Sequence, residues 1–143
     1  MQKLIAVLTL MILFVACAPK SRPTVSERAD SPLTNTRWKL VKLTSLPNGL
    51  PPLTKDVFIQ LDTGRIKGFG GCNNYFGGYT LSGQSLRFTG VGSTKMFCQE
   101  TMEVENKLFK AINSTNQYRI TGTKLELLQD KEVLASFEAL YLQ

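Results

Sequence analysis

The chain after residue 35 is a succession of short segments in which apolar and polar residues alternate, and this pattern limits the folds open to it. Alternate side chains of a strand share one face, so each segment indicates a strand that is buried on one side. Turns rich in Gly, Asp and Ser separate the segments, as in antiparallel hairpins. The expected strands cover residues 37–43, 57–61, 65–69, 79–81, 85–88, 118–120, 125–128 and 133–141. This spacing indicates a small curled antiparallel sheet or a partly open barrel.

One segment departs from this alternation, because the apolar residues of 99–113 fall at helical spacing. They are Met102, Val104, Leu108, Phe109, Ala111 and Ile112. A broad apolar stripe of this kind predicts a helix that packs against the sheet. An antiparallel sheet with one inserted helix is an α+β fold. Residues 91–98, just before the helix, show no period and are expected to be irregular.

Residues 70–79 combine four glycines, two asparagines and three aromatic residues. Gly and Asn tolerate a positive φ, so we expect a loop of tight turns. Such a loop matters first for stability, and we expect Gly71→Val to lower the melting temperature more than Asn73→Ala does, unless the Asn73 side chain caps a buried amide. A phosphate-binding glycine motif is absent, since Asn occupies the place of its third glycine. These three aromatic residues and the preceding Phe69 either line a carbohydrate or lipid groove or pack on the loop itself: Phe69, Tyr75, Phe76 and Tyr79.

The centre of this segment and a second group farther along the chain form a spaced motif. Its positions are Gly71, Cys72, Asn73, Asn74, Tyr75, Thr94, Met96 and Cys98. Together with Trp38 and residues 105–127, the motif resembles the META domain family of HslJ-type, heat-inducible bacterial envelope proteins over residues 34–141. The resemblance implies a small sheet-rich α+β fold, often exported or lipid-anchored, with no established catalytic activity. These positions mark the family rather than a demonstrated site.

The N-terminus has the features of an export signal. Lys3 precedes an uncharged, mostly apolar run of 13 residues, 4–16, which is shorter than the roughly 20 residues of a spanning helix and suits a signal peptide. The run ends in a lipobox-like sequence, with Ala16 before Cys17 but Phe14 at the usual place of Leu. We expect residues 1–16 to be a signal peptide and Cys17 to carry the lipid. An ordinary secretory signal cut near Ala16 or Ala18 and a buried core helix are the alternatives.

The segment 17–35 contains three prolines and many small polar residues, so we expect a lipid-anchored flexible linker before a META-like domain at 36–143. Ala18 follows Cys17, which in enteric-type sorting resembles an outer-membrane lipoprotein that faces the periplasm. The membrane is then one partner through the lipid, and an unknown envelope protein or small ligand is another. No basic run with interleaved aromatics indicates nucleic acid. The net charge of +6 either gives a basic face for anionic lipid or polysaccharide or is ordinary solvated charge.

Two cysteines, Cys72 and Cys98, remain if Cys17 is acylated. In an oxidising compartment such a pair usually forms a disulfide. Two separate buried thiols remain an alternative, as does a thiolate nucleophile with its pKa lowered by Lys95. A metal site with two Cys ligands lacks further ligands, so we expect neither a metal nor a cofactor.

Histidine is absent, which excludes Ser-His-Asp triads, Cys-His dyads and His-ligated zinc. Two close pairs of acids, Glu103 with Glu105 and Asp130 with Glu132, are expected to be solvated rather than to form a glycosidase dyad. We therefore expect no enzyme but an envelope lipoprotein that acts as a binding or stability module linked to the stress response. The alternative is a carrier of a lipid or other apolar ligand within the curled sheet, which needs an apolar cavity of at least about 300 Å³.

Overall fold

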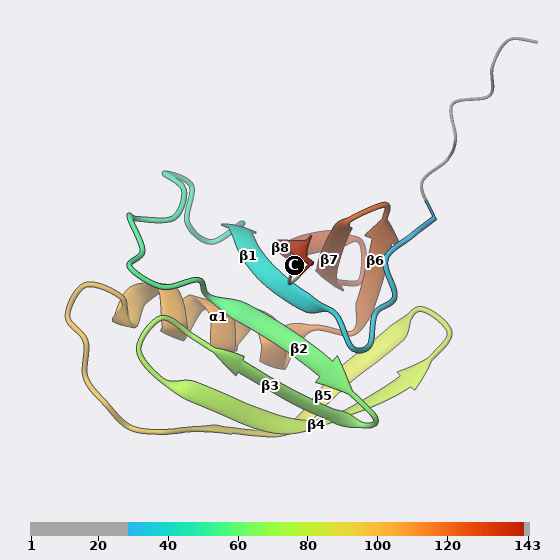
Figure 1. The fold of residues 1–143 in the computed structure, drawn as a ribbon, viewed down its shortest axis with the longest axis horizontal. Helices are drawn as coiled ribbons and strands as arrows, with labels where there is room; N and C mark the ends of the chain where they lie inside the picture. The colour runs from blue at the N-terminus through green and yellow to red at the C-terminus, as the bar shows by residue number, and fades with distance from the viewer. Residues whose placement is uncertain (1–28, 142–143) are drawn as a thin grey trace, which may run out of the picture.

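The computed structural model describes residues 29–141, which form eight strands and one helix (Figure 1). The expected signal peptide 1–16, Cys17 and the linker up to residue 28 lie outside the described residues. Within the described part of the chain, no helix is both long and apolar enough to cross a membrane. The elements are β1 (Arg37–Leu43), β2 (Phe58–Asp62), β3 (Arg65–Phe69), β4 (Asn74–Ser82), β5 (Ser85–Ser93), α1 (Met102–Ser114), β6 (Gln117–Thr121), β7 (Lys124–Gln129) and β8 (Glu132–Leu140).

The sheet closes on itself, because every strand pairs antiparallel with the next and β1 pairs with β8. This arrangement confirms the expected curled antiparallel sheet with one helix and the α+β class. The ring is uneven, since β5 and β6 meet at a single residue pair, Ser85 with Gln117. The helix α1 is inserted between these two strands and packs against β1, β5, β7 and β8. It therefore lies across one opening of the barrel.

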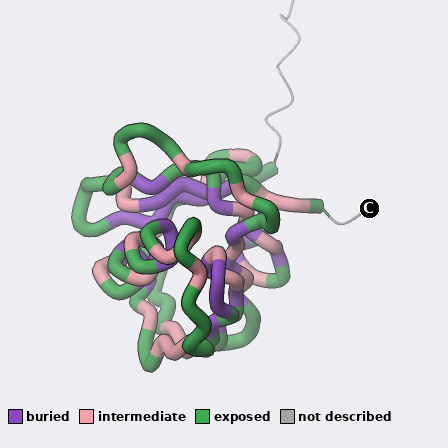
Figure 2. Tube along the Cα trace, turned by 90° about the vertical axis from the view of Figure 1, so that its left-hand side faces the viewer, coloured by how far each residue is buried: buried purple, intermediate pink, exposed green. Residues whose placement is uncertain are grey.

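The interior is filled by the strand positions that alternate toward one face. Trp38 and Leu40 of β1 are at most 2% exposed, and so are Ile59 and Leu61 of β2. Figure 2 shows the buried stretches inside the molecule and the exposed residues in the outer loops. The apolar stripe of α1 joins the same core through Val104, Leu108, Ala111 and Ile112. The alternation in the sequence thus identified the buried face of the first strands and of the helix.

The expected element boundaries are wrong in three places. β4 begins at Asn74, inside the segment 70–79 that was expected to be a loop. β5 continues to Ser93, although 91–98 was expected to be irregular. The register of β4 and β5 shifts between Phe76 and Gly78, near Gly90 with its φ of 58°, and such a bulge interrupts the alternation that marks a strand. α1 starts at 102 rather than 99, after a turn that closes on the carbonyl of Cys98.

The last residues of the expected linker pack against the barrel. Ser31 and Leu33 are buried, and the indole N–H of Trp38 donates to the Leu33 carbonyl at 3.0 Å. Thr34 forms an isolated bridge with Leu61. The packed domain therefore begins near residue 31, earlier than the expected boundary at 36.

A cross-strand pair of Gly68 on β3 and Tyr75 on β4 fixes the packing under the spaced motif. A Cβ on Gly68 would lie 2.3 Å from the Tyr75 ring and 2.3 Å from the carbonyl oxygen of Phe58. The Tyr75 hydroxyl donates to that same carbonyl at 2.9 Å. Tyr75 is 1% exposed, and burial raises the pKa of its hydroxyl well above the usual range. Glycine at 68 is what lets the ring lie across the sheet.

We expect Gly68→Ala to destabilise the protein by about 2 kcal/mol or more, because overpacking a core commonly costs about 1–3 kcal/mol. Gly92→Ala is the control, since a Cβ there meets only Phe76 Cε2, at 3.9 Å. Denaturant unfolding of the two variants measures the difference. A wild-type unfolding midpoint for Gly68→Ala would contradict this account of the packing.

Candidate functional site

The motif residues converge on one buried carboxylate, that of Glu105 on α1, which is 2% exposed. Its Oε2 accepts hydrogen bonds from the backbone N–H groups of Cys72 at 3.1 Å and Asn73 at 2.6 Å. Its Oε1 accepts one from Asn73 Nδ2 at 2.7 Å. A buried carboxylate is costly unless its oxygens are bonded, and three N–H groups meet that need here. We call Glu105, the 70–73 turn and the 94–98 segment the clasp.

Two glycines let the 70–73 turn approach the helix. A Cβ on Gly70 would lie 2.7 Å from Glu105 Oε2, so any side chain there would displace the carboxylate. Gly71 has a φ of 118°, which confirms the expected positive φ at this position. The Thr101 hydroxyl donates to the Gly71 carbonyl at 3.1 Å and ties the turn to the residue before α1.

Asn73 connects the turn to the 94–98 segment through its side chain. Its Oδ1 accepts from the Thr94 hydroxyl at 2.8 Å and from the Met96 N–H at 2.7 Å. Its Nδ2 also donates to the Met96 carbonyl at 3.0 Å. Among the described residues, asparagine adopts a positive φ only at Asn35, so Asn73 does not take the positive φ that the composition of the segment allows and acts through its side chain.

A disulfide joins Cys72 and Cys98, as expected for two cysteines in an oxidising compartment, with sulfur atoms 2.04 Å and Cα atoms 5.7 Å apart. Three alternate residues of the second motif group therefore contact the 70–73 turn: Thr94 by its hydroxyl, Met96 by its backbone and Cys98 by its sulfur. This explains the spacing of the motif. Met96 as a whole residue remains 57% exposed, and Phe97 is 81% exposed.

Tyr75 and Asn74, the last two motif positions of the first group, have different surroundings. The Tyr75 ring packs edge-on against Phe109 of α1, with centroids 5.4 Å apart, so it belongs to the core and not to a groove. Asn74 is exposed. Its side chain makes no hydrogen bond to the described residues.

The expectation that Glu103 and Glu105 are both solvated is right for Glu103 and wrong for Glu105. Glu103 is 71% exposed at its side chain and lies 3.4 Å from Lys107. The signal for Glu105 was its place on the apolar stripe, three residues before Leu108, where a charged residue needs buried partners. Within the described residues, no group of three or more His, Cys, Asp or Glu side chains is placed to hold a metal.

Glu126 is a second acid with little exposure, and it lies on β7, away from the clasp. Lys124 and Arg119 contact its carboxylate at 2.5 Å. The hydrogen bond from Lys124, with that from Arg119, outweighs burial and lowers the pKa of Glu126. Because the pKa of Glu126 is lower in the folded state, its ion pairs stabilise the fold at pH values above the unfolded-state pKa. This stabilisation is lost as the pH falls through the folded-state pKa. The cluster therefore has a structural role.

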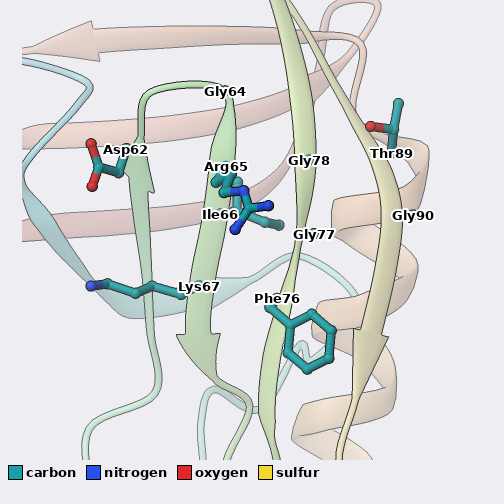
Figure 3. Close-up of a pocket in the computed structure, with 10 residues that line it drawn as sticks. All are labelled: Asp62, Gly64, Arg65, Ile66, Lys67, Phe76, Gly77, Gly78, Thr89 and Gly90. Carbon is teal, nitrogen blue, oxygen red and sulfur yellow. The ribbon is translucent and has the colours of Figure 1, made fainter.

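An open groove of about 930 Å³ lies on the outer face of β2–β5 (Figure 3). Figure 3 shows the Arg65 guanidinium turned toward β4, the Phe76 ring on the same face and Lys67 reaching across β2. Phe76 is 62% exposed. Between Arg65 and Thr89 the floor is bare backbone at Gly77 and Gly78.

The glycine floor has a structural cause. A Cβ on Gly77 would lie 3.0 Å from the Thr89 carbonyl oxygen, and one on Gly78 would lie 2.9 Å from Thr89 Oγ1. The close approach of β5 at its bulge therefore requires glycine in β4. The result is a groove with bare backbone at Gly77 and Gly78 and with two cations, one acid (Asp62) and one exposed aromatic ring beside it.

Four cavities of the described part of the chain open on its surface, and the barrel core contributes only single side chains to their walls, such as Ile66, Val104 and Ala111. Large side chains such as Trp38, Tyr75 and Phe137 occupy the interior instead. An apolar carrier site within the sheet, the alternative that the sequence left open, therefore has no support from these cavities.

Comparison with known proteins gives a family and two relatives of the same fold. A solution structure of a protein from Burkholderia xenovorans is 22% identical, with a TM-score of 0.59, over 76% of this chain and 83% of that chain. A second solution structure is 21% identical, with a TM-score of 0.58, over 72% of this chain and 87% of that one. At this identity the likeness shows the fold alone. No curated protein sequence matches. The family model of the META domain matches residues 31–140, which include the whole barrel and the clasp, and the chain therefore belongs to the META domain family.

Proposed function

We propose that this protein is a non-enzymatic binding module of the bacterial cell envelope, held at the membrane by lipid on Cys17. The observation that carries the proposal is the outer-face groove. Arg65 and Lys67 line it and form no salt bridge with the described residues, and the exposed Phe76 ring lies beside them. Exposed cations beside an exposed aromatic ring in a groove offer both charge and an apolar face to a ligand.

The non-enzymatic part of the proposal is supported by the use of the buried acid. Both oxygens of Glu105 accept hydrogen bonds from the 70–73 turn, so neither is placed to act on a substrate. The sequence offers no histidine as a general base. The motif residues therefore act on the fold, and binding falls to the outer face of the sheet.

The location rests on the N-terminal sequence. The apolar run, the lipobox-like residues before Cys17 and Ala18 after it support an outer-membrane lipoprotein that faces the periplasm. The Cys72–Cys98 disulfide fits an oxidising compartment. The resemblance to heat-inducible HslJ-type proteins extends the proposal to a role in the envelope stress response.

If the clasp is structural, Asn73→Ala destabilises the protein by about 2–4 kcal/mol, because several hydrogen bonds of about 1 kcal/mol each are lost and buried partners are left unpaired. Asn74→Ala is the matched control, since Asn74 is the exposed neighbour in the same motif. Thermal melts of the two variants test this. Equal melting temperatures, with ligand binding lost in Asn73→Ala, would show that the motif is a binding site instead.

We expect Cys17→Ala to abolish lipid attachment and to leave the protein unprocessed or released from the membrane fraction. Fractionation and mass spectrometry of the N-terminal peptide measure both effects. Cys72→Ala is the control that should keep the lipid. A Cys17→Ala variant that fractionates and migrates like the wild type would overturn the lipoprotein proposal.

A photo-crosslinking phenylalanine analogue at position 76 tests the groove in intact envelopes. We expect specific adducts from position 76, because Phe76 lies beside the groove. The same analogue at position 97 is the control, since Phe97 is also exposed but lies in the 94–98 segment. Adducts from position 97 alone would place the binding surface on the clasp side and contradict the groove.

A further inference from the structure

Four residues on the outer face of the barrel form one row across four neighbouring strands. Arg37 of β1 pairs with Gln60 of β2, Gln60 with Lys67 of β3, and Lys67 with Phe76 of β4. We call these residues the cross-strand row. Neighbouring strands lie about 4.8 Å apart, so the row spans about 14 Å. It extends the groove from Phe76 across the sheet to β1.

The first residue of the row carries an unmet hydrogen-bond donor. The Arg37 guanidinium carbon lies 4.3 Å from the centre of the Phe58 ring, which holds the side chain flat on the sheet. Its Nε is buried and makes no hydrogen bond to the described residues. A buried donor without an acceptor is costly. Because this atom is covered, a ligand oxygen would satisfy it only after the guanidinium turns outward from the Phe58 ring.

Charge around the row favours an anionic ligand. Arg37, Lys67 and the adjacent Arg65 form no salt bridge with the described residues. Two acids lie near the row, Asp56 before β2 and Asp62 at the end of β2, and Asp62 also lines the groove as the cross-strand partner of Arg65. Asp56 pairs with Lys39 at 2.6 Å. Asp62 accepts from the Thr63 N–H at 2.8 Å and points away from Phe76 in Figure 3.

The last residue of the row offers a flat apolar face. A Cβ on Gly92 would meet Phe76 Cε2 at 3.9 Å, so the ring lies close over the β5 backbone, and 62% of the residue remains exposed. β2, β3 and β4 are each paired along both edges. A ligand here cannot add a strand, because the backbone groups are used within the sheet, and must be recognised by side chains.

We propose that the cross-strand row binds an extended anionic polysaccharide, with carboxylates on Arg37, Arg65 and Lys67 and a sugar ring on Phe76. This inference rests on the proposed function and names the ligand class of the same groove. Arg and Lys recognise carboxylates through charge-assisted hydrogen bonds. The length of the row suits an extended polymer better than a single small anion, because its two cations, Arg37 on β1 and Lys67 on β3, lie two strands or about 10 Å apart, too far to share one carboxylate.

Calorimetric titration of the detergent-solubilised full-length protein tests the inference. The probe is an oligogalacturonate of about six residues, and its methyl ester is the uncharged counterpart with the same rings. We expect the ester to bind at least about tenfold more weakly, since the charge contacts are lost. We expect Lys67→Gln to weaken acid binding about threefold and Phe76→Ala about tenfold.

Lys131→Gln is the matched control, because it removes the same charge from an exposed turn outside the row. Unchanged melting temperatures show that the variants are folded. The inference is overturned if acid and ester bind equally, if Lys131→Gln weakens binding as much as Lys67→Gln, or if single-stranded DNA binds more tightly through the same residues. Absence of acid binding overturns it as well. If crosslinked adducts still form from position 76 in envelopes, the proposed binding function holds and the ligand belongs to another class.

Discussion

The hydrogen bonds that the Glu105 carboxylate accepts from the 70–73 turn are the interaction on which the rest of the fold depends. They join α1 to the connection between β3 and β4, two parts of the chain 33 residues apart. The Asn73 side chain is hydrogen-bonded to Thr94 and Met96, and the Cys72–Cys98 disulfide joins the same two segments covalently. The helix that covers one opening of the barrel is therefore held at its first turn by polar contacts and along its length by apolar ones.

This arrangement divides the molecule into regions with different tasks. The inner face of the barrel is filled by large apolar side chains, and the clasp uses the polar groups of Asn73 and Thr94 in hydrogen bonds within the fold. The outer face of β1–β4 takes part in neither the core nor the clasp, apart from the glycines that the close approach of β5 requires. Substitutions in the first two regions act on stability, whereas substitutions at Lys67 or Phe76 leave the core intact and change only what the surface offers.

Much of the fold is predictable from the sequence, because it is encoded locally. The alternation around Trp38 and the apolar stripe around Leu108 identify buried faces from their spacing alone. The positive φ of Gly71 is predictable from the residue type. The role of Glu105 is harder to predict from the sequence, since the groups that bind its carboxylate lie in a turn more than 30 residues away. The row from Arg37 to Phe76 is not visible in the sequence at all, because it exists only once the strand register is fixed. The bulge near Gly90 interrupts the alternation of β5, so the second half of this strand is not predicted from the sequence.

The pairing of β1 with β8 brings the two ends of the described chain together, and Ser31 Oγ and Tyr141 Oη share a hydrogen bond of 2.6 Å. The barrel is thus close to a ring in connectivity as well as in shape. A short linker between these ends would require little rearrangement, and new ends opened at an exposed turn such as that after Asp62 would leave every strand pair in place. The order in which the strands are joined is therefore a smaller constraint on this architecture than the contacts made between them.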